Sequence, residues 1–130
     1  MKCSCIPLDF DDWVEIIEKK VGTSDEESMC DECCSRINPG ENREYIRADH
    51  DGRVFENVTC HDCLSIRDVF FCDFSYRRIH SDLREHIDNL DGEVSAECLL
   101  SLTPRARDIV FSYIEDVWKE IVENLDDEEE

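Results

Sequence analysis

Cys30-Asp31-Glu32-Cys33 and Cys60-His61-Asp62-Cys63 share one spacing, C-x2-C, and residues 34 to 59 separate them. A two-residue spacer lets both thiolates of a pair turn onto one metal ion at about 2.3 Å, and two pairs complete the tetrahedral shell of zinc. Cys34 follows directly, but only Cys33 keeps the two-residue spacer. The alternative is four reduced thiols buried as small apolar side chains. Because paired spacing favours the metal, we predict one zinc ion on Cys30, Cys33, Cys60 and Cys63.

The residues between the two pairs have the pattern of a β-hairpin. Residues 44–48 and 54–59 predict two short strands, and Asp49-His50-Asp51-Gly52 predicts the turn, because Asp-Gly is a strong hairpin signal. After Cys63 the pattern becomes helical. A cysteine pair, a hairpin and a second pair that opens a helix resemble a treble-clef finger, as in LIM-like modules. We therefore expect a zinc-finger core over residues 28–72.

Length and cysteine usage limit the class of protein. At 130 residues the chain has the size of a single domain, residues 1–130, in which a metal would supplement a modest apolar core. No apolar signal segment opens the sequence, and nine cysteines, an odd number, fit full disulfide pairing poorly. These observations favour a cytoplasmic protein with reduced or metal-bound thiols. No stretch approaches the length that spans a membrane.

The second strong feature is acidity. The formal net charge is −20, from 34 Asp and Glu against 14 Lys and Arg. Such a chain is repelled by nucleic-acid phosphate and by anionic membranes, which argues against the DNA-binding role of many zinc fingers. The charge favours a basic partner, or it serves only solubility.

The flanking segments predict a helical second half. Residues 9–21 fit both a helical face and a strand, and the sequence leaves this open. Residues 74–125 predict the helical part, which includes an amphipathic helix through Ile79, Leu83 and Ile87. Thr103-Pro104 predicts the start of the last helix, with Thr as N-cap and Pro in the first turn. The fold class expected is therefore α+β, a small finger packed on a helical C-terminal half.

The last helix has its charges reversed relative to the helix dipole. Arg105 and Arg107 lie in its first turns, whereas Glu123 and the acidic tail, residues 126–130, lie at its end. This arrangement is unfavourable by about a few tenths of a kcal/mol per exposed charge. Either the helix frays before the tail, which is the simpler interpretation, or a basic group lies beside that end.

A second zinc ion is a further hypothesis. Cys3 and Cys5 form a C-x-C pair that cannot complete a metal shell alone, so we group them with Cys72 and with Cys98 or a histidine. The alternative is that Cys72 and Cys98 are buried core thiols and that the N-terminal pair is disordered. The number of zinc ions expected is therefore one, with two possible.

Enzymatic function is not expected. Four cysteines make a closed metal site, whereas a catalytic zinc keeps an open position for water. A His-Asn-His nuclease would use His50 and Asn57, but its metal-binding histidine after the second C-x2-C is missing here. The remaining histidines, His61, His80 and His86, are interpreted as surface residues.

Several motifs together resemble a family of small phage and prophage proteins. They are Cys3-Ser4-Cys5, the two C-x2-C segments with Gly40-Glu41 and Asp51-Gly52 between them, residues 102–107 (LTPRAR) and residues 114–118 (IEDVW). The resemblance spans most of the chain. It implies a phage-encoded protein of the host cytoplasm that ligates zinc through the C-x2-C cysteines, and it implies no established activity.

These observations lead to a function hypothesis of protein binding. We expect a non-enzymatic protein that binds a basic or nucleic-acid-binding host protein, as a DNA-mimic inhibitor, because carboxylates along helices can replace phosphates opposite Lys and Arg. The residues expected to bind it are Glu115, Asp116, Glu120, Glu123, Asp126 and Asp127. The alternatives are a zinc-finger adaptor whose charge serves only solubility, favoured if the stripe Val110, Ile114, Val117 and Ile121 is exposed, and a zinc-dependent hydrolase. The oligomeric state is left open.

Overall fold

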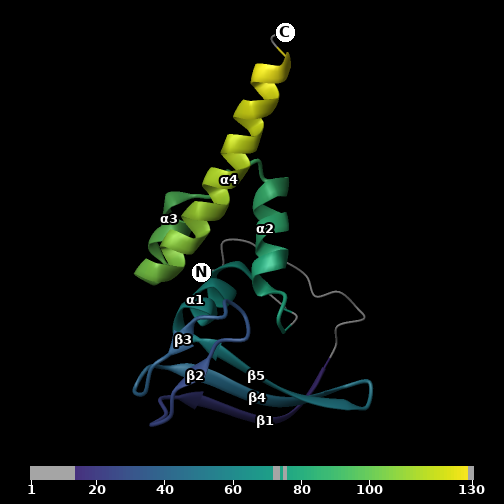
Figure 1. Cartoon of the computed structure of the whole chain (residues 1–130), viewed down its shortest axis with the longest axis vertical. Coiled ribbons are helices and arrows are strands. Elements are labelled where there is room, and N and C mark those ends of the chain that lie inside the picture. Colours follow the sequence, from purple (N-terminus) through teal and green to yellow (C-terminus); the bar gives the residue numbers. More distant parts are fainter. Residues whose placement is uncertain (1–13, 72–73, 75, 129–130) are drawn as a thin grey trace.

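An antiparallel sheet that carries the four-cysteine cluster is followed by a helical half (Figure 1), which confirms the α+β class. The computed structural model describes residues 14–71, 74 and 76–128. The strands are β1 (Glu15–Gly22), β2 (Ser28–Met29), β3 (Arg36–Ile37), β4 (Arg43–His50) and β5 (Arg53–Cys60). The helices are α1 (His61–Phe70), α2 (Ile79–Asn89), α3 (Ala96–Leu100) and α4 (Pro104–Glu128).

The sheet is built on the predicted hairpin. β4 and β5 pair antiparallel from Arg43↔Cys60 to His50↔Arg53, so both strands are longer than the sequence pattern indicated. The turn needs the left-handed backbone of Asp51 and Gly52, and Asp49 Oδ1 accepts the Gly52 N–H at 2.8 Å. β1 pairs with the other edge of β4, which gives the order β1-β4-β5. The described part of residues 9–21 is therefore strand rather than helix.

One face of the sheet packs on α1, and an ion pair lies in that contact. Arg67 of α1 and Glu44 of β4 are both buried, with Arg67 Nη1 2.9 Å from Glu44 Oε1. The Arg67 guanidinium also lies 4.1 Å from the centre of the Phe74 ring. Because these charges share two hydrogen bonds, the pair fixes how α1 crosses the sheet.

The helices enclose the main apolar core. Its buried members are Ile66, Val69, Phe70, Phe71, Ile79, Leu83, Ile87, Cys98, Leu99, Leu102, Ala106, Val110, Ile114 and Val117. The expected start of α4 is confirmed, because Thr103 Oγ1 accepts the Ala106 N–H at 3.4 Å. α4 thus lies against α1, α2 and α3 with its first half.

The second half of α4 extends beyond the rest of the molecule (Figure 1). Trp118 covers Gly92, where an added Cβ would lie 2.4 Å from Trp118 Nε1. The helix continues to Glu128. The described helix thus extends into the acidic tail, and early fraying stays a prediction.

Candidate metal centre

The four predicted cysteine sulfurs come together in space. Cys30 Sγ lies 3.8 Å from Cys63 Sγ, and Cys33 Sγ lies 3.7 Å from Cys60 Sγ. All four ligand atoms lie within 4.8 Å of one another. Four sulfurs at about 2.3 Å from an ion, at tetrahedral angles, are about 3.8 Å apart. The cluster thus has the dimensions of a site for one tetrahedral ion, and a shell of four thiolates is typical of zinc.

The first pair lies in a tight knuckle between β2 and β3. The Cys30 N–H donates to Ser35 O, and the Cys34 N–H donates to Cys30 O, each at 2.9 Å. Cys34 adopts a left-handed φ of 62° and is exposed, outside the cluster. The turn therefore selects Cys33 rather than Cys34, as the spacer predicted.

The second pair lies where β5 becomes α1. Cys60 is the N-cap of α1, and its Sγ accepts the Cys63 N–H at 3.5 Å. Cys30 Sγ accepts further backbone N–H groups, from Cys33 at 3.5 Å and from Cys60 at 3.3 Å. Backbone donors and a helix N-terminus both favour sulfur as a thiolate, which is the form that binds metal.

The thiols share their protons unevenly. Hydrogen bonding with Cys30 lowers the pKa of Cys33, and hydrogen bonding with Cys30 lowers the pKa of Cys60 to about 7. Hydrogen bonding with Cys33 raises the pKa of Cys30, and hydrogen bonding with Cys30 raises that of Cys63. An ion that binds all four sulfurs displaces the protons still held, so its affinity falls with acidity.

Side chains from the helical half reach the sulfurs. His80 of α2 places Nε2 3.1 Å from Cys63 Sγ, and its Nδ1 lies 2.8 Å from the Tyr113 hydroxyl of α4. Burial lowers the pKa of His80, and burial raises that of Tyr113. His80 is therefore not the surface residue expected from the sequence, because α2 turns it toward the cluster. His61 is exposed as expected, whereas the Nε2 atom of His86 is buried.

Arg105 joins the start of α4 to the same cluster. Its guanidinium lies 3.0 Å from Asp62 Oδ2 and 3.8 Å from Cys33 Sγ, and it donates to Ser35 Oγ. The hydrogen bond to Asp62 is the main cause that raises the pKa of Arg105. A positive group beside Cys33 stabilises a thiolate. No sequence spacing related Arg105 to the cysteines, because the two are joined only by the fold.

Glu32, inside the first C-x2-C, reaches across to the N-terminus of α2. Its carboxylate accepts the N–H groups of Arg77 at 2.6 Å and of Ile79 at 3.4 Å. Arg78, the N-cap of α2, makes no side-chain cap of its own, so Glu32 supplies it. Burial raises the pKa of Glu32 against these hydrogen bonds. The knuckle thus positions both the first cysteine pair and the N-terminus of α2.

Polar side chains around the cluster are engaged in hydrogen bonds and ion pairs. A cleft of about 360 Å³ adjoins Cys33, but its polar members His80, Arg105, Tyr113 and Glu32 make the contacts given above. Asn57, which a His-Asn-His nuclease would use, is fully buried and donates to Thr59 Oγ1 at 3.1 Å. A shell of four sulfurs leaves the ion that it binds no open position for water.

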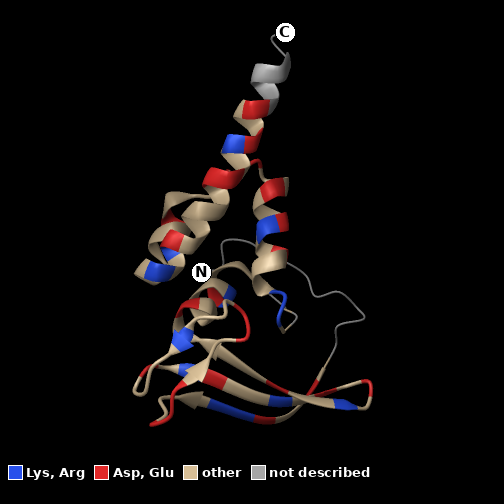
Figure 2. Ribbon diagram, in the orientation of Figure 1, with Lys and Arg blue, Asp and Glu red and all other residues tan. Residues whose placement is uncertain are grey.

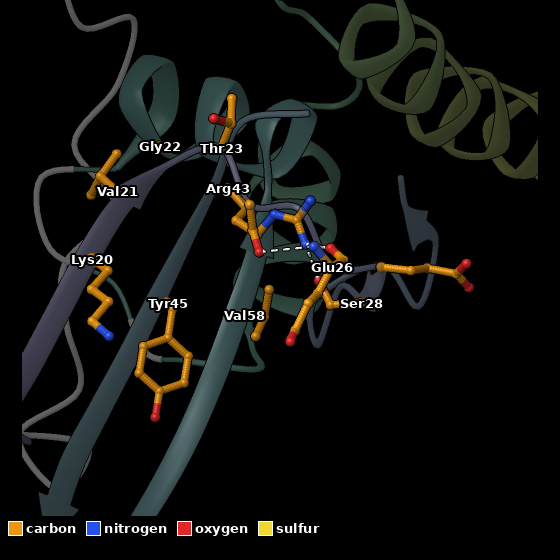
Figure 3. Close-up of a pocket in the computed structure, with 11 residues that line it drawn as sticks. Lys20, Val21, Gly22, Thr23, Glu26, Ser28, Arg43, Tyr45 and Val58 are labelled. Carbon is orange, nitrogen blue, oxygen red and sulfur yellow. Dashed lines mark hydrogen bonds between the residues drawn. The ribbon is translucent and has the colours of Figure 1, made fainter. Parts of the chain in front are cut away.

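A second cleft, of about 400 Å³, lies beside β1 and β4 (Figure 3). Arg43 forms one wall and is buried. Its guanidinium donates to Glu26 O at 2.9 Å, Ser28 Oγ at 2.6 Å and Asn38 O at 2.8 Å. With its donors occupied, Arg43 holds the loop in place and offers little to a ligand.

The second zinc hypothesis falls mostly on other parts of the chain. Cys3, Cys5 and Cys72 lie outside the described residues. Cys98 is buried, and its sulfur accepts a hydrogen bond from Ser95 Oγ at 3.0 Å. A second zinc therefore stays a prediction.

The residues expected to bind a partner lie on α4. Glu115, Asp116, Glu120 and Glu123 are exposed, and Asp116 Oδ2 lies 3.8 Å from Arg84 Nη2. Asp126 and Asp127 belong to the last turns of α4, and their side chains lie outside the described set. The expected stripe divides: Val110, Ile114 and Val117 are buried, and Ile121 is 37% exposed.

Comparisons with known proteins assign no family. No family model, no curated protein and no solved structure matches the chain. The resemblance to phage proteins thus stays an expectation from the motifs. In the described part of the chain, no helix combines the length and apolar character of a membrane span.

Proposed function

We propose that the protein is a non-enzymatic binding protein, in which a zinc-bound finger holds a helical docking surface and the partner is a basic protein. The closed four-cysteine site supports a structural metal. Four contacts tie that site to α2 and α4, through Glu32, His80, Arg105 and Asp62. A docking surface that is held rigid in this way loses less conformational entropy when it binds a partner.

We infer that the finger is of the treble-clef type. The observations behind this inference are a cysteine knuckle between β2 and β3, the β4–β5 hairpin, and a second pair that opens α1. In this assignment the zinc connects the knuckle to the first turn of α1. Loss of the ion would then release the knuckle, and with it the Glu32 cap on α2.

The observation that carries the proposal is an acidic groove between α2 and α4. The groove, of about 360 Å³, is lined by Glu85 and Asp88 of α2 and by Asp116 and Glu120 of α4. Arg84 is the one basic residue that lines it, and it pairs with Asp116. Figure 2 shows acidic residues repeated along both helices. Carboxylates in this arrangement attract Lys and Arg side chains and give fast, salt-sensitive association.

The class of partner proposed is a protein with a basic nucleic-acid-binding groove. Carboxylates on one helix side occupy the place of phosphates opposite Lys and Arg. The net charge of −20 repels nucleic acid itself, so the partner is a protein. The proposal places this binding in the cytoplasm, where reduced thiols are available to the metal.

Affinity capture with a matched control tests the proposal. The zinc-loaded chain is immobilised, exposed to nuclease-treated bacterial lysate and washed from about 0.1 to about 1 M salt. Captured proteins are identified by mass spectrometry, purified, and tested for release of a duplex DNA by the chain. The variant Asp116→Asn/Glu120→Gln/Glu123→Gln should lose capture and competition. The control Glu15→Gln/Asp25→Asn/Glu26→Gln removes as many charges from the sheet half and should keep both.

Two results would overturn it. A partner that is neutral or acidic and stays bound at high salt contradicts charge mimicry. Equal losses in the two triple variants would show that the charge acts only through solubility, as in the adaptor alternative.

A further inference from the structure

A row of apolar side chains is exposed along α4. Phe111, Trp118, Ile121 and Val122 are 42%, 56%, 37% and 55% exposed. Trp118 follows Phe111 by seven residues, and Ile121 and Val122 follow Trp118 by three and four. These spacings place the four side chains on one side of the helix. We call these four residues the α4 seam. Asp116, Glu120 and Glu123, the acidic residues of the proposed function, lie on the opposite side by the same spacing.

Nothing in the described part of the chain covers the distal end of the seam. Among the α4 side chains that the structure describes, up to residue 123, Val117 is the last that is buried, and in Figure 1 the helix continues beyond α2. An isolated amphipathic helix end in water is marginally stable, because packing of its apolar face supplies most helical stability. The continuous helix to Glu128 thus favours an external cover.

The charges along α4 indicate which charges a partner that covers the seam should carry. The sequence ends the helix with Asp126, Asp127 and Glu128, against the preference of the dipole. Its first turns carry Arg107 and also Arg105, which already pairs with Asp62. Arg107 donates to the carbonyls of Leu99 and Leu102, at 3.1 and 3.4 Å, so among the described residues no carboxylate neutralises it. A helix that is basic at its start and acidic at its end is complementary to its own reversed copy.

We propose that a second copy of the chain covers the α4 seam, with the two α4 helices antiparallel. A two-fold axis near Trp118 places the seams face to face. It also brings the acidic end of each helix toward the basic first turns of the other, and it opposes the two helix dipoles. The dimer goes beyond the binding of a basic partner and leaves the acidic groove of each copy open.

The antiparallel register makes a specific pair across the axis. Glu115 follows Phe111 by four residues and Lys119 precedes Val122 by three, so both flank the seam on the same side. In an antiparallel two-fold pair the same flanks meet. Glu115 of each copy then lies within about one helical turn of Lys119 of the second copy. A parallel pair would separate these residues.

Salt dependence distinguishes this dimer from the proposed function. Two chains of −20 repel each other, and salt screens that repulsion, so the apolar seam should associate more tightly as salt rises. Binding of a basic partner should weaken under the same change. Failure of either proposal therefore leaves the other measurable.

Sedimentation velocity on the zinc-loaded full chain tests the dimer, from about 10 to about 100 µM, the weak range for interfaces of modest quality. We expect a concentration-dependent species of twice 15.2 kDa that increases between about 0.1 and 0.5 M salt. Val122→Glu should weaken association at least tenfold. Val54→Glu, at a site 52% exposed on β5, should not. A monomer throughout, or equal effects of the two variants, would overturn the proposal.

Charge reversal tests the orientation. Glu115→Lys or Lys119→Glu alone should weaken the dimer by about two- to fivefold, the usual size for exposed ion pairs. The double variant should restore the wild-type constant, because each copy again presents opposite charges to the other. A double variant that is as weak as the single ones would refute the antiparallel arrangement. Circular dichroism and zinc content confirm that each variant folds.

Discussion

The finger and the helical half are held together by different forces. Around the metal centre the buried apolar cluster has four members, Cys30, Ile37, Cys60 and Cys63, and three of these are metal ligands. The main apolar core has fourteen buried members, and ten of them lie in the helical half, from Ile79 to Val117. A core of four side chains contributes little hydrophobic stabilisation, so the finger depends on its ion and on polar contacts. The helical half has enough apolar contact to persist without them.

Removal of the ion should have the largest effect, because it should destabilise the finger far more than the helical half. Cys30→Ser, or chelation of zinc, should unfold the finger, because structural zinc sites supply folding free energy directly. Much of the signal of α2 and α4 in circular dichroism should remain. Thermal unfolding with zinc analysis measures both. Cys34→Ser is the control, since Cys34 is exposed and outside the cluster, and it should keep one zinc per chain. Loss of all helical signal with the metal would show that the halves fold as one unit.

The buried ion pair between the sheet and α1 comes next. Arg67→Met leaves the buried Glu44 carboxylate with only the half-exposed Lys19 beside it, at 3.8 Å, and should lower the free energy of unfolding by about 3 kcal/mol in urea denaturation. The double variant Glu44→Gln/Arg67→Met should recover a large part of this loss, because no unpaired charge remains. A double variant as unstable as the single one would mean that Arg67 acts through its packing on Phe74 instead.

Variants of His80 test whether the helical half contributes to metal binding by the finger. His80→Ala should weaken zinc binding by about 10- to 100-fold, measured by competition with a chromogenic chelator, because residues that orient ligands tune metal affinity by that amount. Tyr113→Phe should act in the same direction and less, since it removes only the hydroxyl that contacts His80. His61→Ala, next to Cys60 but exposed, should leave the affinity unchanged. An unchanged zinc affinity in His80→Ala would show that the helical half does not contribute to metal binding.

The smallest effect concerns the turn between α2 and α3. Gly92→Ala combines a left-handed φ of 78° with a clash against Trp118, and it should destabilise the helical half by about 1 to 2 kcal/mol. Gly40→Ala has a similar φ of 86° and open space around it, so it reports the backbone effect alone. Equal losses in thermal denaturation would show that Trp118 moves aside without cost.

The ligand set could be predicted because it depends on local geometry. A two-residue spacer allows both thiolates of a pair to reach one ion, and Asp-Gly marks the hairpin that separates the pairs. The same local rules located the N-cap at Thr103 and distinguished Cys33 from Cys34. They failed for residues 15–22, because short apolar patterns fit strand and helix alike until a partner such as β4 is present.

The contacts around the cluster could not be predicted, because they join residues far apart in the chain. Seventeen residues separate Cys63 from His80, and 72 separate Cys33 from Arg105. Arg43 illustrates the same point, since its burial depends on carbonyl groups that only the folded loop gathers around it. No spacing rule describes such contacts, and charge patterning alone assigns these residues to the surface.

Composition, cysteine spacing and apolar periodicity were thus sufficient for the metal ligands, the hairpin, the helical half and the acidity, because each depends on neighbours along the chain. The packing of the helices on the finger determined which polar side chains contact the sulfurs. It also determined how far along α4 the side chains are buried, since Val117 is buried and Trp118 is exposed. That boundary depends on the length of α2 and the position of the turn after it, and so it became visible only in three dimensions.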